Sequence, residues 1–306
     1  MKRIIYMAAA MLMALNLSAQ TSEKFEQRYD LLLSQLGPAG VGIETVLDRW
    51  EAVDSTNAKM LFARFRYLFT KAQTASVVTK PQKNYLGMEP VLSLKDSLGN
   101  DVYYYQVNDF DDGLYAQAVR TIDRTIALYP DRLDYRFVKA NAYIAYEKES
   151  PDMALAYLMS LADLHSERGG RWTYDGETPD DAFFAEAMQE YCYSFYSIGT
   201  PQAMEAFVTL SRRMTELYPD NMDFLNNIGS YYMISKEDYK SALKQYSKAL
   251  KKQPDDYTAI RNSVLAARRL NNPKLEVKYL RMLVQYGPDK EKVIAEGRLR
   301  ALEAKK

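Results

Sequence analysis

Histidine and cysteine are almost absent from this chain of 306 residues, which contains one of each, His165 and Cys192. A single cysteine cannot form an internal disulfide, so the folded state must be stabilised by packing alone. A single histidine excludes a histidine triad, a histidine-rich metal site and the paired-histidine motif of zinc proteases. We interpret His165 as a surface residue at a helix end. Cys192 lies among aromatic residues, which indicates an inert core position.

The chain also lacks net charge, since 40 basic residues face 40 acidic ones. Nucleic-acid binding requires a clustered basic surface, so we expect no nucleic-acid partner. No phosphate-binding loop, nucleophile elbow or dinucleotide fingerprint occurs in the sequence. We therefore predict a protein that is not an enzyme, with no catalytic residues, no cofactor and no metal.

One stretch, Asn108 to Gly113, resembles a calcium loop at first sight. Phe110 occupies a position where such a loop needs a ligand, and Val119 stands where it needs a bidentate glutamate. We expect Asp111 and Asp112 to cap the following helix instead.

A long apolar run is lacking everywhere except at the N-terminus. Lys2 and Arg3 precede an apolar stretch from Ile4 to Leu15, and small residues follow up to Ala19. The stretch is too short for a bilayer span, which needs ~20 apolar residues. The order is that of a secretory signal peptide. We predict that residues 1–19 are removed and that the mature chain is periplasmic or secreted, with no membrane span.

Proline punctuation supplies the main positive signal. Pro219, Pro254 and Pro288 are 35 and 34 residues apart, and each follows a helical stretch and precedes an aspartate. Pro130 with Asp131 is a fourth case. A period of ~34 residues indicates a repeat protein made of helical hairpins.

The unit from Met222 to Pro254 shows which residues repeat: Leu225, Ile228, Gly229, Tyr232, Ala242, Tyr246, Ala249 and Pro254. This arrangement resembles the pattern of the tetratricopeptide repeat family, with Leu225 in place of tryptophan and Tyr246 in place of phenylalanine. The first four residues fall on one helix face and Ala242, Tyr246 and Ala249 on the next, while Gly229 and Ala242 allow a close approach. The resemblance implies an all-α superhelix, or solenoid, of helical hairpins.

Periodicity and punctuation predict these helices: 22–35, 41–53, 56–72, 112–129, 133–147, 151–165, 180–198, 201–218, 222–234, 237–252, 257–270, 273–286 and 289–303. Branched and aromatic residues on both sides of Gly99–Asn100 predict a small β-hairpin insertion within Val91 to Val107. We divide the mature chain into N-terminal helices with this hairpin, 20–110, and a continuous repeat array ending in a capping helix, 111–306.

The resemblance also implies a concave groove lined by the first helix of each hairpin, where a protein or peptide partner binds. The residues expected to face it are Asn226, Ser230, Met233, Arg261, Leu265 and Arg268. Two arginines flanking a leucine would suit an acidic ligand, because guanidinium groups bind carboxylates in a bidentate manner.

The alternative function is glycan binding in the cell envelope, as in helical starch-utilisation lipoproteins. It would need Trp172 and Tyr174 in the long loop 165–179, and the chain lacks the lipid-anchoring cysteine of those proteins. The sequence leaves open whether the groove, the Trp172 loop or the β-hairpin is the binding surface.

Overall fold

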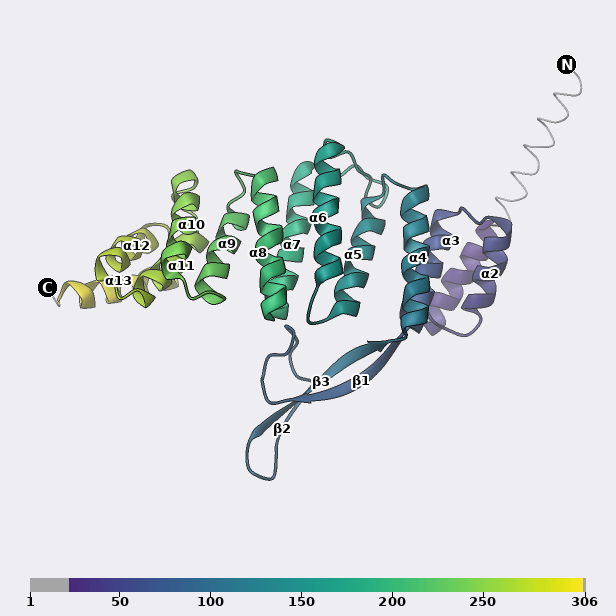
Figure 1. The fold of residues 1–306 in the computed structure, drawn as a ribbon, viewed down its shortest axis with the longest axis horizontal. Helices are drawn as coiled ribbons and strands as arrows, with labels where there is room; N and C mark the ends of the chain where they lie inside the picture. The colour runs from purple at the N-terminus through teal and green to yellow at the C-terminus, as the bar shows by residue number, and fades with distance from the viewer. Residues whose placement is uncertain (1–21, 305–306) are drawn as a thin grey trace, which may run out of the picture. The chain divides into compact units, whose positions relative to one another are not determined.

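The computed structural model describes residues 22–304, so the predicted signal peptide lies outside the described residues. Antiparallel helices follow one another along the chain and are interrupted once by a small sheet (Figure 1). After a helical segment at 22–36, the helices are α2 (Ile43–Val53), α3 (Ala58–Lys71), α4 (Asp112–Leu128), α5 (Leu133–Glu147), α6 (Asp152–Glu167), α7 (Asp181–Ile198), α8 (Pro201–Leu217), α9 (Met222–Ile234), α10 (Tyr239–Lys252), α11 (Tyr257–Arg269), α12 (Pro273–Tyr286) and α13 (Asp289–Glu303). Every predicted helix is confirmed within a few residues. No helix among the described residues has both the length and the apolar character needed to cross a bilayer.

The hairpin of α9 and α10 shows why the repeat residues recur. A Cβ atom built on Gly229 would lie 2.3 Å from Cε1 of Tyr246, far inside normal contact. Ala242 and Tyr246 are fully buried in the same interface. The two helices can therefore pack this closely only because residue 229 has no side chain. The fold is all-α and tetratricopeptide-like, as predicted.

The chain forms two compact units. The first extends to Tyr146 and includes Arg171–Thr178, and its core contains Leu47, Trp50 and Ile122. The second comprises Glu147–Gly170 and the chain from Pro179 onward. Helices α3 and α4 pack against each other across the insertion, and both belong to the first unit. Our division at 110/111 stays a prediction.

The insertion is larger than the predicted hairpin. It is an antiparallel sheet in the order β1 (Gln73–Lys80), β3 (Asp101–Phe110), β2 (Leu92–Lys95). The predicted hairpin corresponds to β2 and β3, which pair from Leu92 opposite Tyr104 to Lys95 opposite Asp101. The prediction missed β1, whose mostly small and polar residues lack the aromatic signal of β3.

Aromatic contacts attach the sheet to the helices of its unit. The ring of Phe110, at the end of β3, lies 5.6 Å from the rings of Phe69 in α3, Tyr115 in α4 and Tyr146 in α5. These contacts hold the base of the insertion against the helices of its unit.

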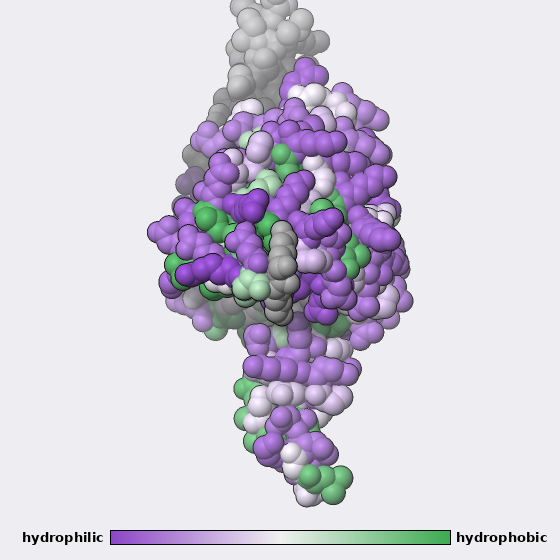
Figure 2. Space-filling view, turned by 90° about the vertical axis from the view of Figure 1, so that its left-hand side faces the viewer, coloured by the Kyte–Doolittle hydropathy of each residue, from purple (hydrophilic) through white to green (hydrophobic). Residues whose placement is uncertain are grey.

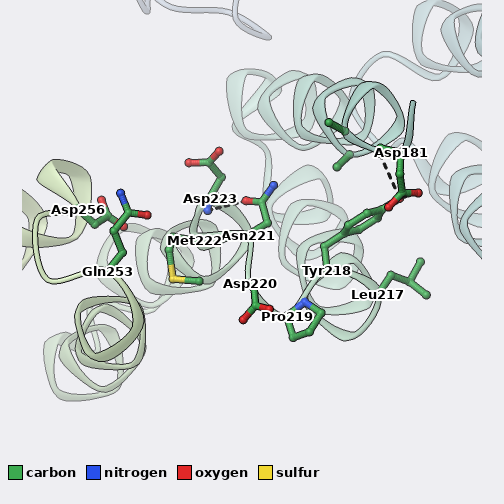
Figure 3. Close-up of a pocket in the computed structure, with 12 residues that line it drawn as sticks. Asp181, Leu217, Tyr218, Pro219, Asp220, Asn221, Met222, Asp223, Gln253 and Asp256 are labelled. Carbon is green, nitrogen blue, oxygen red and sulfur yellow. Dashed lines mark hydrogen bonds between the residues drawn. The ribbon is translucent and has the colours of Figure 1, made fainter. Parts of the chain in front are cut away.

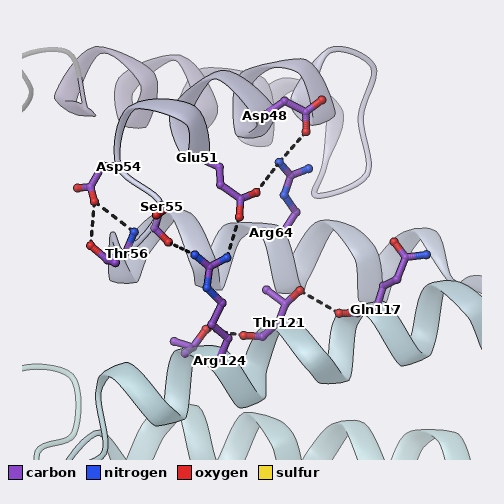
Figure 4. Close-up of polar contacts among 10 residues, drawn as sticks. Asp48, Glu51, Asp54, Ser55, Thr56, Arg64, Gln117, Thr121 and Arg124 are labelled. Carbon is purple, nitrogen blue, oxygen red and sulfur yellow. Dashed lines mark hydrogen bonds and ion pairs between the residues drawn. The ribbon is translucent and has the colours of Figure 1, made fainter.

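An ion-pair network ties α2 to α3 and α4 (Figure 4). Arg64 of α3 contacts Asp48 at 2.7 Å, and Arg124 of α4 contacts Glu51 at 2.9 Å and donates to the carbonyl oxygen of Ser55 at 2.7 Å. Such pairs contribute little energy each, but together they fix the register of three helices in the first unit.

Candidate partner-binding surface

The three predicted groove residues of α9 are engaged within the protein. Asn226 is 4% exposed, and its Nδ2 donates to a carboxylate oxygen of Asp256 at 2.7 Å. Ser230 lies 3.3 Å from the hydroxyl of Tyr246, and Met233 packs against the core of the second unit. Asn226 therefore joins two successive repeats, and its predicted place in the groove stays a prediction. Partner contacts of Ser230 and Met233 stay predictions.

The three predicted residues of α11 are more accessible. Leu265 is 36% exposed between the two arginines. Arg261 lies 3.4 Å from Glu291 of α13, and Arg268 lies 3.1 Å from Glu276 of α12. An acidic ligand would thus compete with carboxylates that already hold these guanidinium groups.

Arg268 has a structural role, because it pairs with the buried side chain of Glu276. Its side chain is only 4% exposed and contacts Arg298 at 2.8 Å as well as Arg268. Hydrogen bonds from Arg298 first, and from Arg268 second, hold the pKa of Glu276 below its ordinary value. The three residues tie α11, α12 and α13 together.

A cleft of about 730 Å³ opens in the second unit where the ends of several helices meet (Figure 3). Four aspartates line it, and no lysine or arginine does: Asp181, Asp220, Asp223 and Asp256. Apolar atoms of Leu217, Met222 and Pro219 complete the walls. The cleft combines negative charge with an apolar wall.

The aspartates lie close together because the N-termini of several helices meet at the cleft. Asp256 caps α11 by accepting from the backbone N–H of Ala259, while Asp181 and Asp223 stand in the first turns of α7 and α9. The positive end of a helix dipole stabilises such carboxylates. The Pro–Asp sequence between α8 and α9 supplies Asp220. The aspartates that begin the helices of successive repeats therefore also line the acidic cleft.

The carboxylates of the cleft differ in what they contact. Asp220 lies 2.8 Å from Nζ of Lys252, and Asp181 accepts from the hydroxyl of Tyr218 at 2.9 Å. Asp223 has no side-chain hydrogen bond or ion pair within the described residues. Burial, and then the charge of Asp256, raise the pKa of Asp223. A cation placed beside it would remove this penalty.

His165 is part of the wall behind this cleft rather than a surface residue, so our interpretation of it was wrong. The ring is buried, stacks on Phe184 at 3.7 Å, and Nε2 lies 2.8 Å from Asp181 and 2.9 Å from the hydroxyl of Tyr218. The sequence showed only a helix end, whereas α6 continues to Glu167 and α7 and α8 cover the ring.

Trp172 does not present an aromatic surface to a sugar. It is 3% exposed and lies under the guanidinium group of Arg136 at 5.2 Å, within the first unit. The neighbouring Thr173 exchanges backbone hydrogen bonds with Asp131 and Leu133. The loop that the glycan-binding alternative requires is therefore used for packing.

The remaining chemical candidates are structural. Cys192 is buried, and burial raises the pKa of its thiol to about 12. Asp111 caps α4 by accepting from the backbone N–H of Leu114, as expected. Between residues 22 and 304, no cluster of three or more histidine, cysteine, aspartate or glutamate side chains is placed to hold a metal ion.

The first unit has its own cleft, of about 650 Å³, which the sequence did not reveal. Its floor is aromatic, with Tyr29, Trp50, Phe62 and Tyr135, and its rim includes Arg66. The hydroxyl of Tyr29 is buried without a hydrogen-bond partner in the described part of the chain. No single stretch of sequence indicates this site, because its residues come from several separate segments.

Comparisons with known proteins found only low structural similarity. No family model matches the chain, and no curated protein sequence matches it significantly. Among solved structures, MamA shares 18% identity over 59% of this chain and 86% of its own, with a TM-score of 0.38. YrrB, described as a TPR protein with an unusual peptide-binding site, shares 11% over 60% of this chain and 84% of its own, with a TM-score of 0.37. The flexible tandem repeat domain of bacterial cellulose synthase shares 16% over 86% of this chain and 89% of its own, with a TM-score of 0.29. At these scores the fold assignment rests on the hairpin geometry of the chain itself, which is that of a helical repeat protein.

Proposed function

We propose that this protein is an exported scaffold without catalytic activity that binds a protein or peptide partner in the aspartate-lined cleft of its second unit. The observation that carries the proposal is the cleft lined by four aspartates and by no basic residue. A partner segment with a lysine or arginine side chain has the matching chemistry. The signal-like N-terminus supports export.

The cleft suits a long basic side chain for two physical reasons. A cationic head beside Asp223 and Asp256 would form charge-assisted hydrogen bonds and offset the burial and the charge of Asp256 that raise the pKa of Asp223. The methylene stem of a lysine or arginine could lie along Leu217 and Met222. Binding would then favour the ionised form of Asp223, so affinity should fall as the solution becomes acidic.

The experiment begins with affinity purification of the tagged protein from envelope extracts and identification of its partner by mass spectrometry. Titration calorimetry then compares the wild type with Asp223→Asn, which removes the one cleft carboxylate that has no side-chain partner. We expect the partner's Kd to rise about tenfold, with weaker dependence on salt, because a charge-assisted hydrogen bond contributes about 1.5–3 kcal/mol.

The matched control is Glu296→Gln, which removes one acidic charge from the exposed side of α13 in the same unit. It should leave the affinity unchanged. If Asp223→Asn also left the affinity unchanged, the cleft would not be the binding site, and the surface of Arg261, Leu265 and Arg268 would be tested next.

A further inference from the structure

The two faces of the β-sheet have opposite character. Strand alternation and the cross-strand register put every charged strand residue on one face: Lys80, Lys95, Asp101 and Asp109. The other face carries the exposed aliphatic side chains of the strands, which are Val77, Leu92 and Leu94. Hydrophobic side chains are visible on the sheet where it extends away from the helices that carry it (Figure 2). The second face is therefore uncharged, and polar side chains such as Gln106 and Asn108 lie on it beside the aliphatic ones.

The charged face is covered by the protein itself. Tyr105 on that face is fully buried, its ring lies 5.4 Å from Tyr85, and its hydroxyl donates to the carbonyl oxygen of Gln82. These contacts come from the loop 81–90, between β1 and β2. The uncharged face is covered only at its base among the described residues, where Phe110 packs on the helices of its unit. Val77 lies outside this cover and is 63% exposed.

Strand β1 is also an open edge over its whole length. It pairs with β3 from Gln73 to Lys80 and, within residues 22–304, with no other strand. It contains no proline or glycine, and Lys80 at its end is its only charged residue. Folded proteins usually protect an edge of this kind with charges, prolines or bulges, because its free backbone groups can pair with another strand.

We propose that β1 pairs antiparallel with β1 of a second copy of this chain, about a two-fold axis at Val77, to form one six-stranded sheet. A two-fold axis perpendicular to the sheet keeps the same face upward in both copies. Val77 then meets its symmetry mate and Ala75 meets Thr79, all on the uncharged face. Lys80 falls opposite Thr74, so the pairing brings no like charges together.

The size of the contact sets its strength. Eight residues of strand give an edge about 26 Å long. Such an edge buries less than the ~1,200 Å² that stable interfaces need, so the dimer should be weak and reversible.

Sedimentation velocity of the chain without its predicted signal peptide tests the proposal over about three decades of concentration, up to about 0.5 mM. The wild type should show a reversible monomer–dimer equilibrium. Val77→Lys and Val77→Glu should each raise the dimer Kd about tenfold or more, because each sets two like charges at the axis. An equimolar mixture of the two variants should associate again. Both substitutions fall on an exposed side chain, so the fold should tolerate them.

The control Leu94→Lys changes the same face at the opposite edge of the sheet, and the dimer should persist. Val77→Cys should give a disulfide-linked dimer on oxidation, since paired Cα atoms in antiparallel strands lie about 4.5–5.5 Å apart, within disulfide range. Leu94→Cys should not, and the buried Cys192 does not compete. The proposal is overturned if the wild type stays monomeric at every concentration, or if the mixed Val77 variants fail to associate. It is also overturned if Leu94→Lys abolishes the dimer as Val77→Lys does, because that result would indicate face-to-face packing of the sheets.

Discussion

The contact between Gly229 and Tyr246 allows a stability change to be worked out from the structure. In Gly229→Ala, the new methyl group would lie 2.3 Å from Cε1 and 2.7 Å from Cδ1 and Cζ of the Tyr246 ring. Carbon atoms prefer about 3.5–4.0 Å, so the ring or the helix must move by about 1 Å or more. The ring is fully buried, so it cannot move out into solvent without losing its packing.

Two opposing terms decide the magnitude. Alanine is favoured over glycine in a helix by about 1 kcal/mol, whereas overpacking a core costs about 1–3 kcal/mol. A forced shift of this size belongs at the upper end of the second range. We expect Gly229→Ala to lose about 1–2 kcal/mol and Gly229→Leu more than that, with a Tm lower by about 2–4 °C per kcal/mol.

Gly297 of α13 provides the matched control, because a Cβ there meets nothing within 4 Å. Gly297→Ala should therefore show the helix preference alone and raise the Tm slightly. The assay is thermal unfolding of both variants by circular dichroism. If Gly229→Ala were as stable as Gly297→Ala, the close packing of α9 on α10 and the register of the repeat would be refuted.

Three further predictions concern the second unit and the N-terminus. Arg268→Ala alone should lower the free energy of unfolding only slightly, since Arg298 still pairs with Glu276. The double change with Arg298→Ala should lower it by about 2 kcal/mol in urea unfolding, because a buried carboxylate then loses both partners. Equal losses for the single and double variants would contradict this. The pKa of Glu276 is lowered in the folded state, so its ionised side chain stabilises the fold at neutral pH, and this stabilisation is lost as the pH falls through the folded pKa. Glu276→Gln should therefore make the free energy of unfolding less dependent on pH in the acidic range. The same pH dependence in wild type and variant would argue against this. Mass measurement of the native protein should show Gln20 as the first residue, and an uncut N-terminus in a membrane fraction would rule out the signal peptide.

The helices could be predicted because their signals are local. An apolar stripe at helical spacing, a proline after each hairpin and a small residue at each crossing all lie within one repeat, and α9 with α10 follows them closely. Strand β1 was missed because its evidence is not local. Its sequence alone does not distinguish a strand from a loop, and the strand is defined by its pairing with β3.

Residue roles within the second unit were harder to predict than the helices, for a related reason. The family pattern places Asn226 on the groove side of α9, but it cannot reveal that the cap residue of α11, Asp256, lies within hydrogen-bonding distance.

The same limit applies to His165, whose burial depends on Phe184 and Tyr218, both distant in the sequence. A repeat pattern thus predicts which side of a helix faces its neighbours, while the charge of the resulting cleft depends on which caps several repeats bring together. The acidic residues at the helix starts of each repeat form a common cleft only when the repeats are stacked. In our proposal, the aspartate-lined cleft is the feature by which this protein distinguishes a basic partner from an acidic one.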